Sequence, residues 1–195
     1  LRSNQPVNFK FEGVEYSITT EEVAIFPQGY AALMTETGLL QDEPSMLLMD
    51  LGGWTVDLMR IDNAIPAADT AHSLELGMIR CVDDIREQVR RETGLSLTDA
   101  QIENMLAGQP CTVRDTVRDI VNRQGRKYTE HLLSAVMEAG FDLRAIPAVL
   151  LGGGASVVSR HLSPKDGLCY AVEARFRGIR YKSLSAPDTR PENRL

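Results

Sequence analysis

Two glycine-rich stretches hold the residue types that could do chemistry in this chain. The first reads MDLGGWTVD, residues 49–57. Asp50 ends an apolar run, and a carboxylate at the end of a buried strand can hold a hydrated Mg²⁺. Gly52 and Gly53 have no Cβ, so their N–H groups can approach phosphate oxygens, and the Thr55 hydroxyl adds a donor. This pattern suits the terminal phosphates of a nucleotide.

The same stretch also has a purely structural interpretation. Two consecutive glycines are common in tight hairpin turns, where Asp50 would be a solvated strand end and Thr55 a strand former. Both interpretations remain open for this stretch alone, so a second motif has to decide between them.

The second stretch reads LLGGGASVV, residues 150–158. Gly152, Gly153 and Gly154 lie between an apolar strand and a helix that begins near Ala155. They bring the backbone close to whatever lies beyond the strand, and the helix adds the positive end of its dipole. A nucleotide's sugar and α-phosphate fit there, although a structural strand-to-helix turn is the alternative. The pattern GxxxxGK[ST] is absent, and the stretch lacks the third glycine of GxGxxG.

The elements around the first motif form a predicted antiparallel meander. Three apolar runs of strand length cover residues 45–51, 54–62 and 64–73. Gly52-Gly53 separates the first two runs and Asp62-Asn63 the last two, and both pairs are typical of short hairpins.

A helical period follows the meander. Apolar residues recur at helical spacing from Leu74 to Val89, and the helix should stop at Gly94. Thr98 and Gln101 form a capping-box signature for a second helix. A longer apolar stripe over residues 112–140 contains Gly125, which could bend or split that helix.

The C-terminal part alternates strand and helix in the prediction. A strand enters the second motif, GLCYAV (167–172) reads as another strand, and EARFRGIRYKSL (173–184) as a final helix with Phe176, Ile179 and Leu184 inward. A meander continued by alternating strands and helices predicts an α/β fold with a ribonuclease-H-like mixed sheet.

Three segments describe the expected organisation. Residues 1–38 hold a strand hairpin, VNFKFEGVEYSI, and a connecting helix. Residues 39–184 hold the mixed sheet, with a helical insertion at about 95–142, and residues 185–195 are expected to be a disordered tail.

Composition excludes several function classes. The net charge is -6 and the 21 basic residues are spread along the sequence, so direct binding of nucleic acid is not expected. Cys81, Cys111 and Cys169 show no CxxC spacing, which fits a reducing cytoplasm and argues against disulfide or zinc frameworks. No apolar run is long enough for a membrane span. The chain begins at Leu1 without an initiator methionine, as a processed or truncated product would.

Together the two motifs resemble those of a superfamily that contains actin, the heat-shock ATPases and the sugar kinases. MDLGGWTVD is similar to its second phosphate loop, and AVLLGGGASVV to its adenosine loop, in the same order. FPQGYAALM resembles the connecting helix before the second phosphate loop, and EARFRGIRYKSL the helix that closes the domain. Within the superfamily, FPQGYAAL and GFDLRAIPAVLLGGG look most like bacterial actin-like proteins of the ParM/StbA plasmid-segregation kind.

The resemblance implies roles for individual residues toward ATP or ADP and Mg²⁺. Asp50 would organise Mg²⁺ through its waters. The phosphate donors would be Gly52, Gly53, Trp54 and Thr55, and the adenosine loop Gly152, Gly153, Gly154 and Ala155. Relatives often carry a small or hydroxyl residue at position 54, so only the Trp54 N–H is expected to take part.

Gln28 is the candidate for positioning the attacking water. A Gln or Glu near the start of the connecting helix has this role in actin-like ATPases, and an amide suits it. The alternative is that Gln28 merely follows Pro27 at a helix start. Asp57 is expected to serve hydrogen bonding in the loop.

The resemblance covers only the second domain of such an ATPase, because no Asp-x-Gly hairpin of a first phosphate loop precedes Phe26. The expected function is therefore the nucleotide-binding half of a filament-forming ATPase that segregates plasmid DNA through a DNA-binding adaptor. The fragment alone should bind nucleotide weakly and hydrolyse little. The alternatives are a domain of a sugar or acetate kinase and a non-hydrolysing interaction domain.

Overall fold

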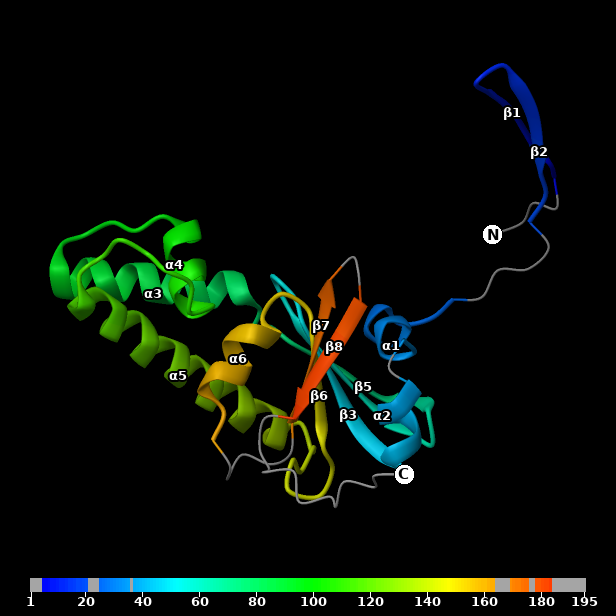
Figure 1. The fold of residues 1–195 in the computed structure, drawn as a ribbon. Helices are drawn as coiled ribbons and strands as arrows, with labels where there is room; N and C mark the ends of the chain where they lie inside the picture. The colour runs from blue at the N-terminus through cyan, green and yellow to red at the C-terminus, as the bar shows by residue number, and fades with distance from the viewer. Residues whose placement is uncertain (1–4, 21–24, 36, 164–168, 176–177, 184–195) are drawn as a thin grey trace, which may run out of the picture.

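A mixed six-stranded sheet forms the centre of the computed structural model, which describes residues 5–20, 25–35, 37–163, 169–175 and 178–183 (Figure 1). The strand order is β5-β4-β3-β6-β7-β8. Strands β3 (Ser45–Leu51), β4 (Val56–Asp62) and β5 (Ile65–Leu74) form the antiparallel meander. Strands β6 (Ala148–Leu151) and β7 (Cys169–Arg175) continue the sheet in parallel with β3. The predicted mixed α/β fold is confirmed.

Strand β3 is apolar on both faces because helices cover both sides of the sheet. Leu47 and Met49 pack into the cluster formed with α5 (Asp115–Glu138) and α6 (Ala155–His161). Met46 and Leu48 point to the other face, where they meet residues of α1 (Gln28–Leu33) and α2 (Thr37–Asp42). The two-residue period of the strand therefore sorts its side chains between two cores.

The helical insertion predicted at about 95–142 holds α4 (Asp99–Leu106) and α5, and α3 (Met78–Thr93), which precedes it, packs against α4 and the first half of α5. These helices share a cluster of their own that includes Ile85, Ile102 and Val121. The predicted boundaries hold where caps define them: Gly94 ends α3 with φ 72°, and Thr98 and Gln101 form a complete capping box on α4. The start of α3 was predicted too early, because Leu74 still belongs to β5.

Helix α5 is continuous through Gly125, so the glycine does not split it into two helices. A Cβ at this position would lie 2.6 Å from Nε2 of His161 and 2.9 Å from Cδ2 of Leu106. Gly125 therefore allows α5 to approach α4 and α6 closely, and the single helix joins the insertion to the sheet.

The prediction of a final helix over residues 173–184 is wrong. The chain there forms the end of β7 and an antiparallel strand β8 (Gly178–Ser183). Residues 179–182 read Ile-Arg-Tyr-Lys, an alternation of period two that suits a strand, and Gly178 disfavours a helix. Phe176, Leu184 and the tail 185–195 lie outside the described residues.

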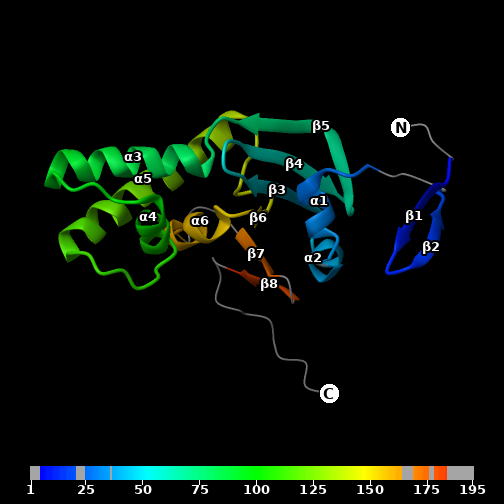
Figure 2. The same ribbon diagram turned by 90° about the horizontal axis from the view of Figure 1, so that it is seen from above.

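Strands β1 (Val7–Phe11) and β2 (Val14–Ile18) form the predicted N-terminal hairpin. Figures 1 and 2 show it apart from the six-stranded sheet in both views. In the part of the chain that the structure describes, no helix is long and apolar enough to cross a membrane.

Candidate functional site

The first glycine motif is a hairpin turn between β3 and β4. The two strands pair up to Leu51 and Val56, and the N–H of Gly52 donates to the carbonyl oxygen of Thr55 at 3.0 Å. Within the described residues, the N–H groups of Gly53, Trp54 and Thr55 donate to no protein acceptor. The turn thus presents consecutive unpaired donors, which is the backbone arrangement that binds an anion.

The start of helix α3 is hydrogen-bonded to the carbonyl oxygens of this turn. The N–H groups of Gly77, Met78 and Ile79 donate to the carbonyl oxygens of Trp54, Gly52 and Gly53 at 3.0, 3.0 and 2.9 Å. The helix end is thereby satisfied by the turn rather than by a capping side chain.

Gly77 is a residue that sequence reasoning missed. A Cβ on it would lie 2.3 Å from the carbonyl oxygen of Gly53, so only glycine allows this contact. The sequence offers one sign of this role: Gly77 stands directly before the residues with helical spacing, at the position where a capping side chain is usual.

The second glycine motif follows β6 and lies against the end of β3. Gly152 has φ +81°, and a Cβ there would lie 2.7 Å from Oδ1 of Asp50. The N–H of Gly154 donates to the carbonyl oxygen of Leu51 at 3.2 Å. Two motifs a hundred residues apart therefore meet at the adjacent carboxyl ends of two parallel strands, where ligands bind in open α/β sheets.

A hollow of about 350 Å³ lies between the two motifs and the helical insertion. Its lining includes Gly53, Gly153 and Gly154 from the motifs, with Met78 and Glu103 from the helices. Sequence reasoning missed Glu103, which brings a carboxylate from α4 to this hollow. A hydroxyl-rich group such as a ribose can be recognised by a carboxylate of this kind.

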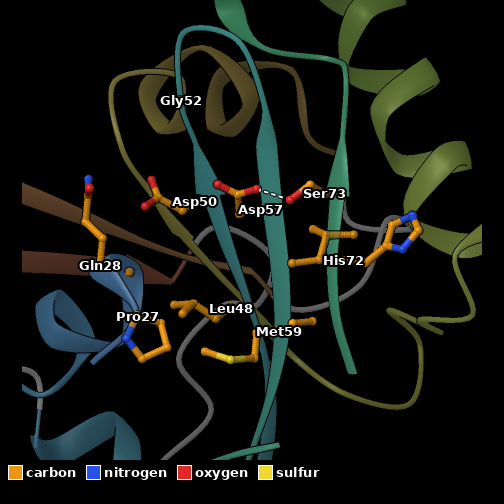
Figure 3. A pocket seen from close by; sticks show the side chains of 12 residues that line it. Pro27, Gln28, Leu48, Asp50, Gly52, Asp57, Met59, His72 and Ser73 are labelled. Carbon is orange, nitrogen blue, oxygen red and sulfur yellow. Dashed lines mark hydrogen bonds between the residues drawn. The ribbon is translucent and has the colours of Figure 1, made fainter. Parts of the chain in front are cut away.

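A second hollow, of about 510 Å³, lies on the other side of Gly52. Gln28, Asp50, Asp57 and Ser73 line it together (Figure 3). Gly29 brings Gln28 there, because the missing side chain lets α1 pack on the sheet: a Cβ would lie 3.1 Å from Cδ2 of Leu48 and 3.4 Å from Cβ of Asp50.

The carboxylates of Asp50 and Asp57 repel each other in this hollow. The two residues are directly paired across β3 and β4. Burial, and then the charge of Asp57, raise the pKa of the Asp50 carboxyl above its ordinary value. Asp57 itself accepts a hydrogen bond from the Ser73 hydroxyl at 2.5 Å and a long one from the Thr55 hydroxyl at 3.4 Å.

This carboxylate pair fits Mg²⁺ better than a metal held by protein ligands alone. The described residues contain no group of three or more His, Cys, Asp or Glu side chains placed to hold a metal ion. Mg²⁺ is usually held by one or two carboxylates, with water and phosphate oxygens completing its shell. Asp50 and Asp57 meet that requirement, and a bound cation would relieve their repulsion.

The structure brings most of the predicted site residues together, in two neighbouring hollows that share Gly52. Trp54 lines neither hollow and its side chain is 77% exposed, so its backbone alone belongs to the turn. Ala155 is the buried first residue of α6, and Gly152 contacts Asp50 without lining either hollow.

Solved structures with this architecture are actin-like. An archaeal actin homologue, Ta0583, matches with a TM-score of 0.59 at 16% identity, over 81% of this chain and 53% of that one. The ParM protein of pSK41 without nucleotide matches with a TM-score of 0.59 at 15% identity, over 86% and 50%. A Bacillus thuringiensis ParM hybrid with ADP matches with a TM-score of 0.52 at 18% identity, over 77% and 24%. The chain has the actin-like fold.

The family follows from the sequence itself. Residues 48–164, more than half of the chain, match the family model of archaeal actin homologues of the MreB-like type, C-terminal domain. The chain belongs to this family. It spans about half the length of the first structures it matches, and a direct comparison with curated protein sequences finds no significant match.

Proposed function

We propose that the chain supplies one half of a nucleotide clamp in a filament-forming, actin-like ATPase and binds Mg-ATP and Mg-ADP. The observation that carries this proposal is the meeting of the two glycine motifs beside Asp50 at the ends of β3 and β6. Ta0583, which has the same fold, has been solved in complex with ADP.

The two hollows and the turn between them suit different parts of the nucleotide. The β- and γ-phosphates accept hydrogen bonds from the unpaired N–H groups of Gly53, Trp54 and Thr55. The adenosine lies in the hollow beside Gly153 and Gly154, with Glu103 on its ribose. Asp50 and Asp57, which line the second hollow, would hold Mg²⁺.

Gln28 is placed to act on water rather than on the nucleotide. Its side chain lines the Asp50 hollow from the start of α1. An amide both donates and accepts hydrogen bonds, so it can orient a water molecule toward a terminal phosphate. Asp50 would hold Mg²⁺, and the bound ion would supply positive charge beside the phosphates.

The clamp has a second half outside these 195 residues. Phosphoryl transfer needs positive groups and donors on both sides of the transferred group. This chain covers only about half of each of the first matched structures, and the family model describes a C-terminal domain. The isolated chain therefore binds nucleotide weakly and turns it over little.

The finer assignment is to plasmid segregation in the cytoplasm, with self-association into filaments and a DNA-binding adaptor. Its support is the FPQGYAAL and GFDLRAIPAVLLGGG segments and a likeness to pSK41 ParM as strong in TM-score as that to the archaeal protein. The net charge of -6 favours an adaptor over direct DNA binding.

Sedimentation of the protein, extended upstream through its own reading frame, tests the filament function. With Mg-ATP it should pellet, and with Mg-ADP it should remain in the supernatant. Phosphorylation of a sugar or acetate without any nucleotide-dependent pellet would show a kinase instead. Nucleotide binding with neither pelleting nor turnover would leave only the interaction domain.

A further inference from the structure

Two separate elements line the hollow between the glycine motifs, which is called the adenosine hollow below after its proposed ligand. The end of α4 lines it with Glu103, Leu106 and Ala107, and the start of α6 lines it with Ser156 and Val157. Helix α6 lies between the sheet and α4 (Figures 1 and 2). The width of the adenosine hollow therefore depends on how the end of α4 is held relative to α6.

The end of α4 lies against the side chain of Arg160 from α6. Gly108 has φ 72°, and its N–H donates to the carbonyl oxygen of Met105 at 3.0 Å. The N–H of Gln109 donates to the carbonyl oxygen of Asn104 at 2.7 Å, which completes a Schellman motif. A Cβ on Gly108 would overlap Nη1 and Cζ of Arg160 and would lie 2.9 Å from Nη2. The guanidinium of Arg160 thus occupies the space that the missing side chain leaves.

The next residue of α6 makes a similar contact with α5. A Cβ on Gly125 would lie 2.6 Å from Nε2 of His161. Arg160 and His161 stand four residues after Ser156 and Val157, so they continue the face of α6 that lines the adenosine hollow. One face of α6 therefore borders the hollow at its start and contacts the helical insertion at its end.

The contact of Arg160 with Gly108 is not needed to fold α4. Within the described residues Arg160 forms no ion pair and no hydrogen bond, and its side chain is exposed. Helix α4 is held independently by Ile102, Met105 and Leu106, which are buried against α3 and α5. The positive charge of Arg160 at the C-terminal end of α4 interacts favourably with the helix dipole. The contact therefore affects the placement of this end more than the stability of the helix.

We infer that Arg160, seated on Gly108, positions the end of α4 at the adenosine hollow and thereby sets the affinity for the nucleoside part of the nucleotide. This inference rests on the proposed function. Glu103 lies on the same short helix, so a shift of α4 moves its carboxylate relative to Gly153 and Gly154. The turn between β3 and β4 is held by the start of α3 instead. Arg160 is therefore a positioning residue for the nucleoside and not for the phosphates.

Paired titrations of the 195-residue chain test this inference, with Mg-ADP and Mg-pyrophosphate as probes and the emission of Trp54 as the signal. Pyrophosphate has two phosphates, as ADP has, but no nucleoside. Arg160→Met should weaken the binding of Mg-ADP by about fivefold, the effect of one misplaced hydrogen bond, and leave that of Mg-pyrophosphate unchanged. Its melting temperature should stay within about 2 °C of the wild type. Arg126→Met changes an exposed arginine of the neighbouring helix α5 and should bind both probes like the wild type.

Gly108→Ala tests the same contact from the other side. The added Cβ displaces the guanidinium of Arg160, which can swing into solvent, so Mg-ADP binding should weaken as in Arg160→Met. Gly94→Ala is the matched control, because Gly94 also has φ 72° and a Cβ there meets nothing within 4 Å. Both alanines should lower the melting temperature by a similar amount, about 2–8 °C, since both are forced into the left-handed region. Only Gly108→Ala should lose affinity for Mg-ADP.

The double variant Gly108→Ala with Arg160→Met should bind Mg-ADP like either single variant, because each removes the same contact. Additive losses would contradict the inference. So would equal Mg-ADP affinities in Arg160→Met, Arg126→Met and the wild type, or an Arg160→Met variant that loses affinity equally for both probes.

The two probes also separate this inference from the proposed function. If the wild type binds Mg-pyrophosphate as tightly as Mg-ADP, the adenosine hollow and the role of Arg160 are both wrong, while the phosphate site stands. If neither probe changes the emission of Trp54 or the melting temperature of the wild type, the proposed function fails and the inference fails with it.

Discussion

Asp50 shows how a site residue can act against the stability of its own fold. Burial and Asp57 raise the pKa of Asp50, so its pKa in the folded chain is above its unfolded value. The protonated carboxyl therefore favours the folded state at acidic pH. This contribution to stability is lost as the pH rises through the folded pKa, and at neutral pH the ionised carboxylate destabilises the fold. A Mg²⁺ ion in the nucleotide complex would make the same charge favourable.

The substitution Asp50→Asn should separate these two effects. At neutral pH the melting temperature of the nucleotide-free chain should rise by about 1–2 °C, a small gain because the carboxyl is only half-buried. Mg-dependent nucleotide binding should be lost. Asp62→Asn is the matched control in the paired strand: Arg60 and Ser45 lower the pKa of Asp62, so this change should not stabilise the chain. A lower melting temperature for Asp50→Asn would contradict the account.

Ser73 is predicted to position Asp57 for the cation. Its hydroxyl donates to Asp57 at 2.5 Å from the end of β5, and both groups are exposed, so the bond matters little for folding. Ser73→Ala should weaken Mg-ATP binding by about three- to tenfold, the effect of one hydrogen bond of roughly 1 kcal/mol, with an unchanged melting temperature. Ser73→Thr keeps the hydroxyl and should restore binding. Equal affinity in all three proteins would remove Ser73 from the site.

At the scale of elements, the turn between β3 and β4 depends on the start of α3. Gly77→Ala places a Cβ against the Gly53 backbone and should destabilise the chain by about 1–3 kcal/mol, or about 3–10 °C in melting temperature. Gly153→Ala is the control for stability, because a Cβ there meets nothing within 4 Å. Thermal denaturation compares the melting temperatures of the two variants. An equal decrease in both would show that the loss of any glycine, and not the contact of Gly77 with Gly53, lowers the stability.

The contact of α5 with α6 is predicted to weaken in acid. Burial, then Arg160 and Arg126, lower the pKa of His161, and within the described residues its buried Nε2 has no hydrogen-bond partner. The unfolded chain therefore takes up a proton near pH 6.5 before the folded chain does, and stability falls as the pH drops below that value. His161→Gln should reduce the loss in melting temperature between pH 7.5 and 5.5. His131→Gln, exposed on α5, should leave that loss as in the wild type.

The elements that were predictable from sequence are those defined by neighbours in the chain. Glycine turns, a capping box and the two hydrophobic periods specify the meander, α4 and both glycine motifs. Gly29 and Gly77 were missed because they pack against Leu48 and Gly53, and Glu103 because it shares a hollow with the second motif. All these neighbours are distant in sequence. The end of the chain was wrong because a helical pattern was fitted to residues that alternate as a strand.

At the scale of the whole molecule, we propose that the chain is one side of a nucleotide clamp. The described residues bring the donors, the carboxylates and Gln28 to one edge of the sheet, while catalysis needs a second set of groups across the phosphates. The chain should therefore bind without efficient turnover, and sustained Mg-dependent release of phosphate by these 195 residues would contradict the two-sided account.

The emission of Trp54 provides the most direct test of the nucleotide site. It is the single tryptophan of the chain, it is exposed, and its backbone belongs to the turn between β3 and β4 that we propose binds phosphate. Titration of the 195-residue chain with ATP should produce a saturable change in its emission with a weak, Mg-dependent affinity that Asp50→Asn abolishes. An emission that stays constant to millimolar Mg-ATP, together with an unchanged melting temperature, would contradict the assignment of this turn to nucleotide binding.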